Sequence, residues 1–181
     1  MKRVLLVAVL LPLLVACTLP HPRPPDDPPT SPAASQLVID LGGGVWIAVL
    51  GTDSSWAPTA EHNCADAVHR LVTPTGDYQV ALLRADCTGA PQALNGFHGY
   101  FVSPPAGSEV ATATTPLGPA RLFSHQYEEC TNSCGFGTDE VALVAVGDRT
   151  IQAIAVAGVS GAARTRDRAQ LVSLLQGLRK A

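Results

Sequence analysis

The chain has 181 residues, of which 46% are hydrophobic and 15% are charged, and its formal net charge is −3. This length and this apolar content suit one globular domain with a sizeable core. A nucleic-acid-binding protein needs a basic surface to neutralise phosphates, so the acidic balance excludes nucleic acid from the expected partners.

The N-terminus predicts an export signal that ends at a modified cysteine. Lys2 and Arg3 precede an apolar run over residues 4–15, which is too short to span a bilayer in the usual way. The run ends in Leu14-Val15-Ala16-Cys17, which resembles the lipobox of bacterial lipoproteins at all four positions. Two other interpretations stay open: a plain secretory signal with an incidental cysteine, and an N-terminal membrane anchor.

The lipobox resemblance implies that residues 1–16 are a signal peptide, and that the thiol of Cys17 carries a diacylglycerol. Acyl chains on Cys17 would hold the protein on the outer face of the cell membrane without spanning it. Loss of Lys2 and Arg3 leaves 10 of the 12 Lys and Arg residues against 15 Asp and Glu residues, so the mature charge is −5. The strong preference for arginine over lysine is typical of a GC-rich, actinobacterial genome.

Residues 17–35 predict a tether between the lipid and the domain, which then comprises residues 36–181. In polyproline II conformation, at about 3.1 Å per residue, the tether would extend roughly 50 Å. The segment lacks the apolar side chains that a core requires, and it contains seven prolines: Pro20, Pro22, Pro24, Pro25, Pro28, Pro29 and Pro32.

The first half of the domain predicts a β-hairpin followed by a helix. The strand-like runs 37–39 and 45–50 flank three glycines at 42–44, which indicate a turn and not a phosphate-binding loop. Ser54 or Ser55 can cap a helix in whose first turn Pro58 is well placed. The apolar face of that helix would consist of residues at helical spacing, namely Cys64, Val68, Leu71 and Val72.

The second half predicts further strands and a terminal helix. Apolar runs predict strands over 78–83, 99–102 and 120–127, and a hairpin that joins 141–146 to 150–159. The terminal helix has Asp167 early and Arg179 and Lys180 late, as the helix dipole favours. Its apolar stripe consists of Leu171, Leu174, Leu175 and Leu178.

These elements predict an α+β fold, an antiparallel β-sheet with about two packed helices. Over residues 36–179 their order resembles the PsbP-like fold. The resemblance rests on Gly118-Pro119-Ala120 leading into a strand, on the later hairpin and on the leucine-rich helix. It implies a non-catalytic binding module and supplies no site residues.

Besides Cys17, the chain contains four cysteines, an even number that predicts two disulfides in an exported protein. Three connectivities are possible. We favour Cys64 with Cys87, which joins the expected helix to the end of the next strand, and Cys130 with Cys134, which closes a short turn. The alternative is a redox or metal site at Cys130 and Cys134, but their spacing differs from that of CxxC motifs.

The remaining polar residues contain no recognisable catalytic, cofactor or metal motif. Residues at i, i+4 and i+7 of the expected helix could present two imidazoles and a carboxylate to a metal, but they are more simply the solvated face of that helix: His62, Asp66 and His69. Trp46 and Trp56 are expected in the core. A hydrolase would need an acid together with two or three of Ser103, Ser124, Ser160, His98 and His125 in one cleft.

The sequence therefore predicts a lipid-anchored, non-enzymatic binding module for a protein, a lipid or a wall component of the cell envelope. No catalytic residue, metal or cofactor is expected. The ligand should bind in an apolar concavity between the sheet and a helix, where a few polar groups orient it. The alternative function is that of an exported hydrolase acting on an envelope substrate.

Overall fold

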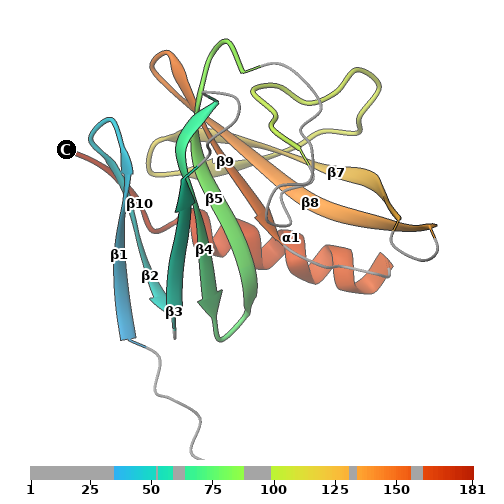
Figure 1. Ribbon diagram of the computed structural model, residues 1–181, viewed down its shortest axis with the longest axis horizontal. Coiled ribbons are helices and arrows are strands. Elements are labelled where there is room, and N and C mark those ends of the chain that lie inside the picture. The colour runs from blue at the N-terminus through green and yellow to red at the C-terminus, as the bar shows by residue number, and fades with distance from the viewer. Residues whose placement is uncertain (1–34, 52, 59–63, 88–98, 131–133, 156–160) are drawn as a thin grey trace, which may run out of the picture. The chain divides into compact units, whose positions relative to one another are not determined.

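Ten strands and one helix form from the residues that the computed structural model describes, which are 35–51, 53–58, 64–87, 99–130, 134–155 and 161–181 (Figure 1). All of these residues belong to one compact unit, Pro32–Ala181. In chain order the elements are β1 (Ser35–Gly42), β2 (Val45–Gly51), β3 (Asp53–Pro58), β4 (Ala65–Thr73), β5 (Gly76–Arg84), β6 (Ala111–Thr115), β7 (Gly118–Cys130), β8 (Cys134–Val146), β9 (Arg149–Ala155), α1 (Gly161–Leu175) and β10 (Leu178–Lys180).

The strands form two antiparallel sheets. The larger sheet has seven strands in the order β3-β4-β5-β9-β8-β7-β6, and the smaller has three in the order β1-β2-β10. Most neighbours in a sheet are also neighbours in the chain. Two pairings join distant parts of the sequence, since β5 pairs with β9, and β10 returns from the end of the chain to β2.

The central strands of the larger sheet are apolar because both of their faces are buried. In β5, Tyr78, Val80 and Leu82 belong to one buried cluster, whereas Ala81 and Leu83 belong to another. Successive side chains of a strand point to opposite faces, so this division follows from the chain itself. The two clusters lie on the two sides of the seven-stranded sheet.

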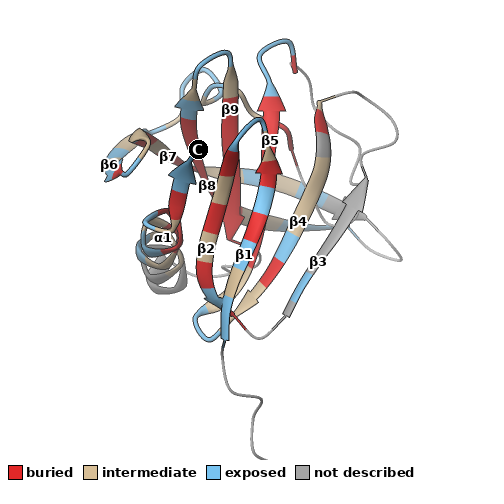
Figure 2. Ribbon diagram, turned by 90° about the vertical axis from the view of Figure 1, so that its left-hand side faces the viewer, coloured by how far each residue is buried: buried red, intermediate tan, exposed pale blue. Residues whose placement is uncertain are grey.

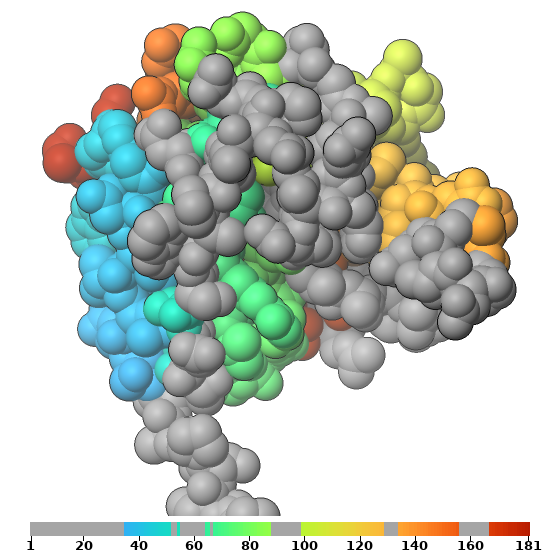
Figure 3. Space-filling view, in the orientation of Figure 1, coloured from blue at the N-terminus to red at the C-terminus, as the bar shows by residue number. Residues whose placement is uncertain are grey.

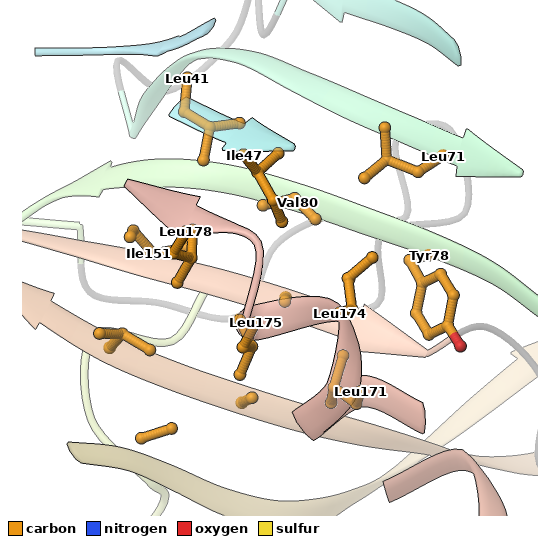
Figure 4. Packing of buried hydrophobic residues seen from close by; sticks show 14 of the residues in the cluster. Leu41, Ile47, Leu71, Tyr78, Val80, Ile151, Leu171, Leu174, Leu175 and Leu178 are labelled. Atoms are coloured by element: carbon orange, nitrogen blue, oxygen red, sulfur yellow. The ribbon is translucent and has the colours of Figure 1, made fainter. Parts of the chain in front are cut away.

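The larger cluster packs the smaller sheet and α1 against one face of the seven-stranded sheet (Figure 2). Ile47 of β2, Val80 of β5, and Leu171 and Leu175 of α1 are all completely buried in it. Figure 4 shows these side chains together, with Leu171 beside the ring of Tyr78. Burial of the apolar face of α1 in this cluster stabilises a helix that would be marginal in isolation.

The opposite face of the sheet is covered by the segment that precedes β6. Gln152 of β9 is completely buried, donates a hydrogen bond from Nε2 to the carbonyl of Gly99 and accepts one from the amide of Phe101. Phe101 packs edge-on against Phe123, with ring centroids 5.3 Å apart. The segment is therefore held to the sheet by both polar and aromatic contacts.

The predicted α+β class is wrong, because the described residues form mainly strands and a single helix. The helix expected from Ser54 or Ser55 to Val72 is replaced by β3 and β4, which form an antiparallel pair. Leu71 faces the larger cluster and Val68 packs against the smaller one. Because both faces of β4 carry apolar residues that pack against a cluster, apolar residues three and four apart do not distinguish a helix from a strand here.

Two further expectations also fail. Residues 99–102 form no strand, and β6 was not predicted. The terminal helix ends at Leu175, and Leu178 is buried on β10 instead. A Cβ at Gly177 would lie 2.1 Å from the carbonyl oxygen of Ala48, so the chain can approach β2 here only because residue 177 is glycine.

The expected hairpins are confirmed, although residues 156–159 of the second one lie outside the described residues. β1 and β2 pair around a turn in which Gly43 and Gly44 have positive φ angles of 60° and 71°. β8 and β9 pair from Val146 opposite Arg149 to Glu140 opposite Ala155. The strands expected over 78–83 and 120–127 correspond to β5 and β7, and β7 is the longer of the two.

Candidate functional site

The candidate site lies where the outer edge of β7 loses its neighbouring strand. β6 pairs with β7 over five residues and begins at Ala111, opposite Leu122. β7 continues to Cys130 and remains paired with β8 along that whole length. Beyond Leu122, no strand of the described residues pairs with the outer edge of β7.

A cavity of about 410 Å³ opens at this edge. Its walls come from three parts of the fold: the segment before β6, the edge of β7, and Arg168 of α1. Most of the lining is polar, and it consists of Pro105, Ser108, Glu109, Ser124, His125, Gln126 and Arg168. The cavity therefore combines a strand edge with charged side chains, which favours a polar ligand over an apolar one.

Three side chains form a hydrogen-bonded network beside the cavity. The hydroxyl of Ser124 donates to Oε1 of Glu140 over 2.6 Å, and Arg168 donates from Nε to Oε2 of the same carboxylate over 2.8 Å. Arg168 also donates from Nη2 to the hydroxyl oxygen of Ser124 over 3.1 Å. The hydroxyl is thus both donor and acceptor within the network.

The network follows from strand register and from the position of α1. Ser124 and Glu140 are direct partners in the β7–β8 pair, so their side chains lie on the same face of the sheet. The carboxylate side chain of Glu140 is 2% exposed, and Arg168 reaches it from α1. A carboxylate buried to this extent requires such a counter-charge.

His125 occupies the other face of the same strand. Because it follows Ser124 directly, its ring points away from the network. The imidazole packs edge-on against Phe101, with ring centroids 4.8 Å apart. The cavity is lined by both residues because it follows the edge of the strand, where the two faces meet.

A second cavity, of about 370 Å³, lies between β2, the turn after β4, and α1. We call it the apolar cleft; it is lined by Ala48, Val49, Leu50, Thr73, Pro74, Thr75, Gln170, Ser173 and Leu174. Leu50 is 65% exposed. The cleft lies between the smaller sheet and the helix, and more than half of its lining residues are apolar.

Tyr78 lies next to a residue of the apolar cleft. Its hydroxyl is within hydrogen-bond distance, 3.1 Å, of the Thr75 hydroxyl. Burial raises the pKa of Tyr78, and hydrogen bonds from Thr75 and Thr73 partly oppose that increase. The phenol is therefore neutral at physiological pH and acts as a hydrogen-bonding group.

The expected helical stripe of two histidines and an aspartate does not exist. His69 lies on β4 and is partly buried, and burial lowers its pKa while the charge of Asp40 partly opposes this. His62 and the side chain of Asp66 lie outside the described residues. No group of three or more potential metal ligands occurs within the part of the chain that the structure describes.

The structure brings two of the hydrolase candidates, Ser124 and His125, to one cavity. Ser103 is exposed and does not line that cavity, while His98 and Ser160 lie outside the described residues. Trp46 is partly buried and belongs to neither core cluster, contrary to expectation, and the side chain of Trp56 is likewise not described.

The Cys64–Cys87 disulfide is confirmed. It joins the residue before β4 to a residue just after β5, and the two positions are 23 apart in sequence. Cys134 is also disulfide-bonded, and its backbone lies opposite Cys130 in the β7–β8 register. The side chain of Cys130 is outside the described residues, so the Cys130–Cys134 pairing stays a prediction.

Sequence reasoning missed Glu140, Arg168 and Glu109 as members of the candidate site. None of them lies in a local motif, because register joins Ser124 to Glu140 and tertiary packing brings in Arg168. Comparison with protein-family models and with curated proteins gives no match. Within the described residues, α1 is too short and too polar to cross a membrane.

Proposed function

We propose that the chain is a bacterial lipoprotein, held on the outer face of the cell membrane by a diacylglyceryl group on Cys17. Its domain is a non-enzymatic binding module for a protein, a lipid or a wall component. The lipobox tetrapeptide Leu14-Val15-Ala16-Cys17 supports the anchor. The proline-rich segment 18–35 supports a role at some distance from the membrane surface.

One observation carries the preference for binding over catalysis: the hydroxyl of Ser124 donates to Glu140, whose carboxylate is paired with Arg168. A serine nucleophile needs a general base that accepts its proton, usually a histidine oriented by an acid. The neighbouring His125 is directed to the opposite face of the sheet. The arrangement therefore favours a structural role for Ser124.

A fluorophosphonate probe, which labels activated serines, tests this preference on the full chain purified in detergent. We expect no covalent labelling. Labelling that is lost in both Ser124→Ala and His125→Ala variants would establish the alternative, an exported hydrolase. Ser103→Ala is the matched control, since Ser103 is exposed and lies outside the polar cavity.

The apolar cleft is the proposed binding site for the apolar part of a ligand, with Thr75, Gln170 and Ser173 available to orient it. The probe is anilinonaphthalene sulfonate, whose fluorescence rises in apolar sites. Leu50→Asp should abolish the increase. Val38→Asp should leave it unchanged, because Val38 is equally exposed, at 64%, but does not line the cleft. Equal effects of both changes would reject the cleft as the site.

A further inference from the structure

We propose that the outer edge of β7, from Ser124 to Glu128, accepts an extended basic segment of a partner protein as an additional β-strand. This inference goes beyond the proposed function, because it assigns a second site, separate from the apolar cleft, to the binding module. It is carried by three features: an incomplete strand pairing, a polar cavity in the position of the missing strand, and the charge of the surrounding side chains.

The register directs backbone groups of β7 to this edge, where no strand of the described residues pairs with them beyond Leu122. The β6–β7 hairpin has a two-residue turn between Thr115 and Gly118, and such a turn closes on a hydrogen-bonded pair. Alternate residues from Gly118 onward therefore direct their N–H and C=O groups to the side of β6. With no register shift along β7, these residues include Ser124, Gln126 and Glu128.

The β8–β9 hairpin gives the same assignment independently. Its two-residue turn closes on the pair formed by Val146 and Arg149, so even-numbered residues of β8 direct their backbone groups to β9. Odd-numbered residues of β8 must then bond to β7, and their partners in β7 are also odd-numbered. The even-numbered residues of β7 therefore face outward.

The polar cavity lies where a continued β6 would run. If β6 extended backward from Ala111, Glu109 would come opposite Ser124. Instead the chain leaves the sheet, and Ser108 and Glu109 form one wall of the cavity while Ser124 and Gln126 form another. An extended segment placed between these walls would continue the line of β6 and complete the pairing of β7.

The charge at this edge favours a basic segment. Glu109 and Glu128 are exposed, whereas the cation among the lining residues, Arg168, is already paired with Glu140. Lysine or arginine on the added strand would meet these two carboxylates, which form no ion pair with another residue of the described ranges. Pairing of β7 with β7 of a second copy would instead bring like charges together, so a second copy is the less suitable occupant.

The farther part of the β7–β8 hairpin, beyond Leu122 on β7, has no strand of the described residues on its outer side. Figure 3 shows this end of the hairpin projecting at the side of the molecule, below the yellow-green loop that leads to β6. Phe136 on β8 is 82% exposed there. An incoming strand therefore meets an accessible edge with an apolar contact close to it.

A peptide titration of the isotope-labelled full chain in detergent micelles tests the proposal. The probe is a seven-residue peptide that alternates lysine with threonine and valine. We expect it to shift the amide resonances of Ser124, Gln126 and Glu128 and to slow their hydrogen exchange. The same peptide with alternate amides N-methylated cannot form the strand pairing and should bind at least about tenfold more weakly.

Two substitutions of Gln126 distinguish the contribution of its backbone N–H to peptide binding from the contribution of its side chain. Gln126→Pro removes an outward N–H and should weaken binding about tenfold, whereas Gln126→Ala keeps that N–H and should bind within about twofold of the unchanged protein. A glutamate-containing version of the peptide should not bind. Cys17→Ala should leave peptide binding unchanged, so failure of this inference is distinguishable from failure of the lipid anchor.

The proposal is overturned by equal binding of the N-methylated peptide, by equal binding of the glutamate peptide, or by resonance shifts confined to the apolar cleft. It is likewise overturned if the chain forms a dimer in which β7 cross-links to β7 of the second copy. The N-methylated peptide is tested on the unchanged protein, so the result does not depend on whether Gln126→Pro folds.

Discussion

Arg168 of α1 and Glu140 of β8 form an ion pair that joins the helix to the seven-stranded sheet, with Nε 2.8 Å from Oε2. The carboxylate side chain is 2% exposed and the arginine side chain 33%. The pair also fixes the hydroxyl of Ser124. Its geometry therefore bears on stability, on the position of α1 and on the question of catalysis.

Removal of Arg168 should destabilise the protein because it leaves a buried carboxylate without its counter-charge. We expect Arg168→Met to lower the free energy of unfolding by about 2–4 kcal/mol, less than for a fully buried pair because the arginine is partly exposed. The double change Arg168→Met with Glu140→Gln should recover much of this loss. Urea denaturation of the four proteins of this cycle measures the coupling, and a coupling near zero would contradict the account.

Gln152 should be essential for the position of the segment 99–102. Gln152→Leu keeps a similar volume but leaves the Gly99 carbonyl and the Phe101 amide without their partner, at a cost of about 2–4 kcal/mol in the free energy of unfolding. Amide hydrogen exchange at Phe101 should become faster. Gln126→Leu, at an exposed position, is the control and should change stability by less than about 0.5 kcal/mol.

The Cys64–Cys87 disulfide should contribute about 3 kcal/mol to the free energy of unfolding, mainly by restricting the unfolded chain. Replacement of both cysteines by serine measures this contribution in chemical denaturation. Alkylation of the envelope protein without a reductant should modify no cysteine of the domain. Four alkylated cysteines would instead overturn the disulfide framework and revive a metal or redox role for Cys130 and Cys134.

His69 should make the protein less stable in mildly acidic solution. Burial holds its pKa below the ordinary value of 6.5, so the unfolded chain binds a proton at a higher pH than the folded protein does. The stability that neutral His69 provides is complete above pH 6.5 and decreases as the pH falls from 6.5 toward the lower, folded-state pKa. The denaturation midpoint should therefore decrease as the pH is lowered from 7.5 to 5.

Two variants check that His69 causes this decrease. His69→Gln should flatten the dependence of the denaturation midpoint on pH. Asp40→Asn should steepen it, because the charge of Asp40 partly offsets the effect of burial. An unchanged slope in His69→Gln would assign the acid sensitivity to other groups.

The hairpins were predictable because their signals are local. Glycines at 42–44 and at 147 lie between apolar runs, and the structure forms turns at both places. The prediction of a helix over Ser54 to Val72 was wrong, because β3 and β4 occupy this region. The error does not come from the helix propensity of individual residues. Apolar residues on both faces of β4 contact a cluster, Leu71 on one face and Val68 on the other, so β4 lacks the regular alternation by which a strand is recognised. Its pairing with β3 and β5 defines it as a strand.

The candidate site was predictable only in part. Ser124 and His125 were named as chemically relevant residues, and they do line one cavity. Their roles depend on facts that no local pattern contains: the register that places Glu140 opposite Ser124, and the packing of α1 that brings Arg168 to both. The position at which β6 begins, and beyond which the edge of β7 borders the cavity, is likewise a property of the whole sheet.

The most direct test of the central claim is the mass of the N-terminal peptide of the protein extracted from native membranes. The account predicts a chain that begins at Cys17 and carries a diacylglyceryl group on the thiol, and it predicts that Cys17→Ala abolishes both cleavage at this position and uptake of labelled fatty acid. A chain that retains residues 1–16, or one that begins at Cys17 with an unmodified thiol, would contradict it.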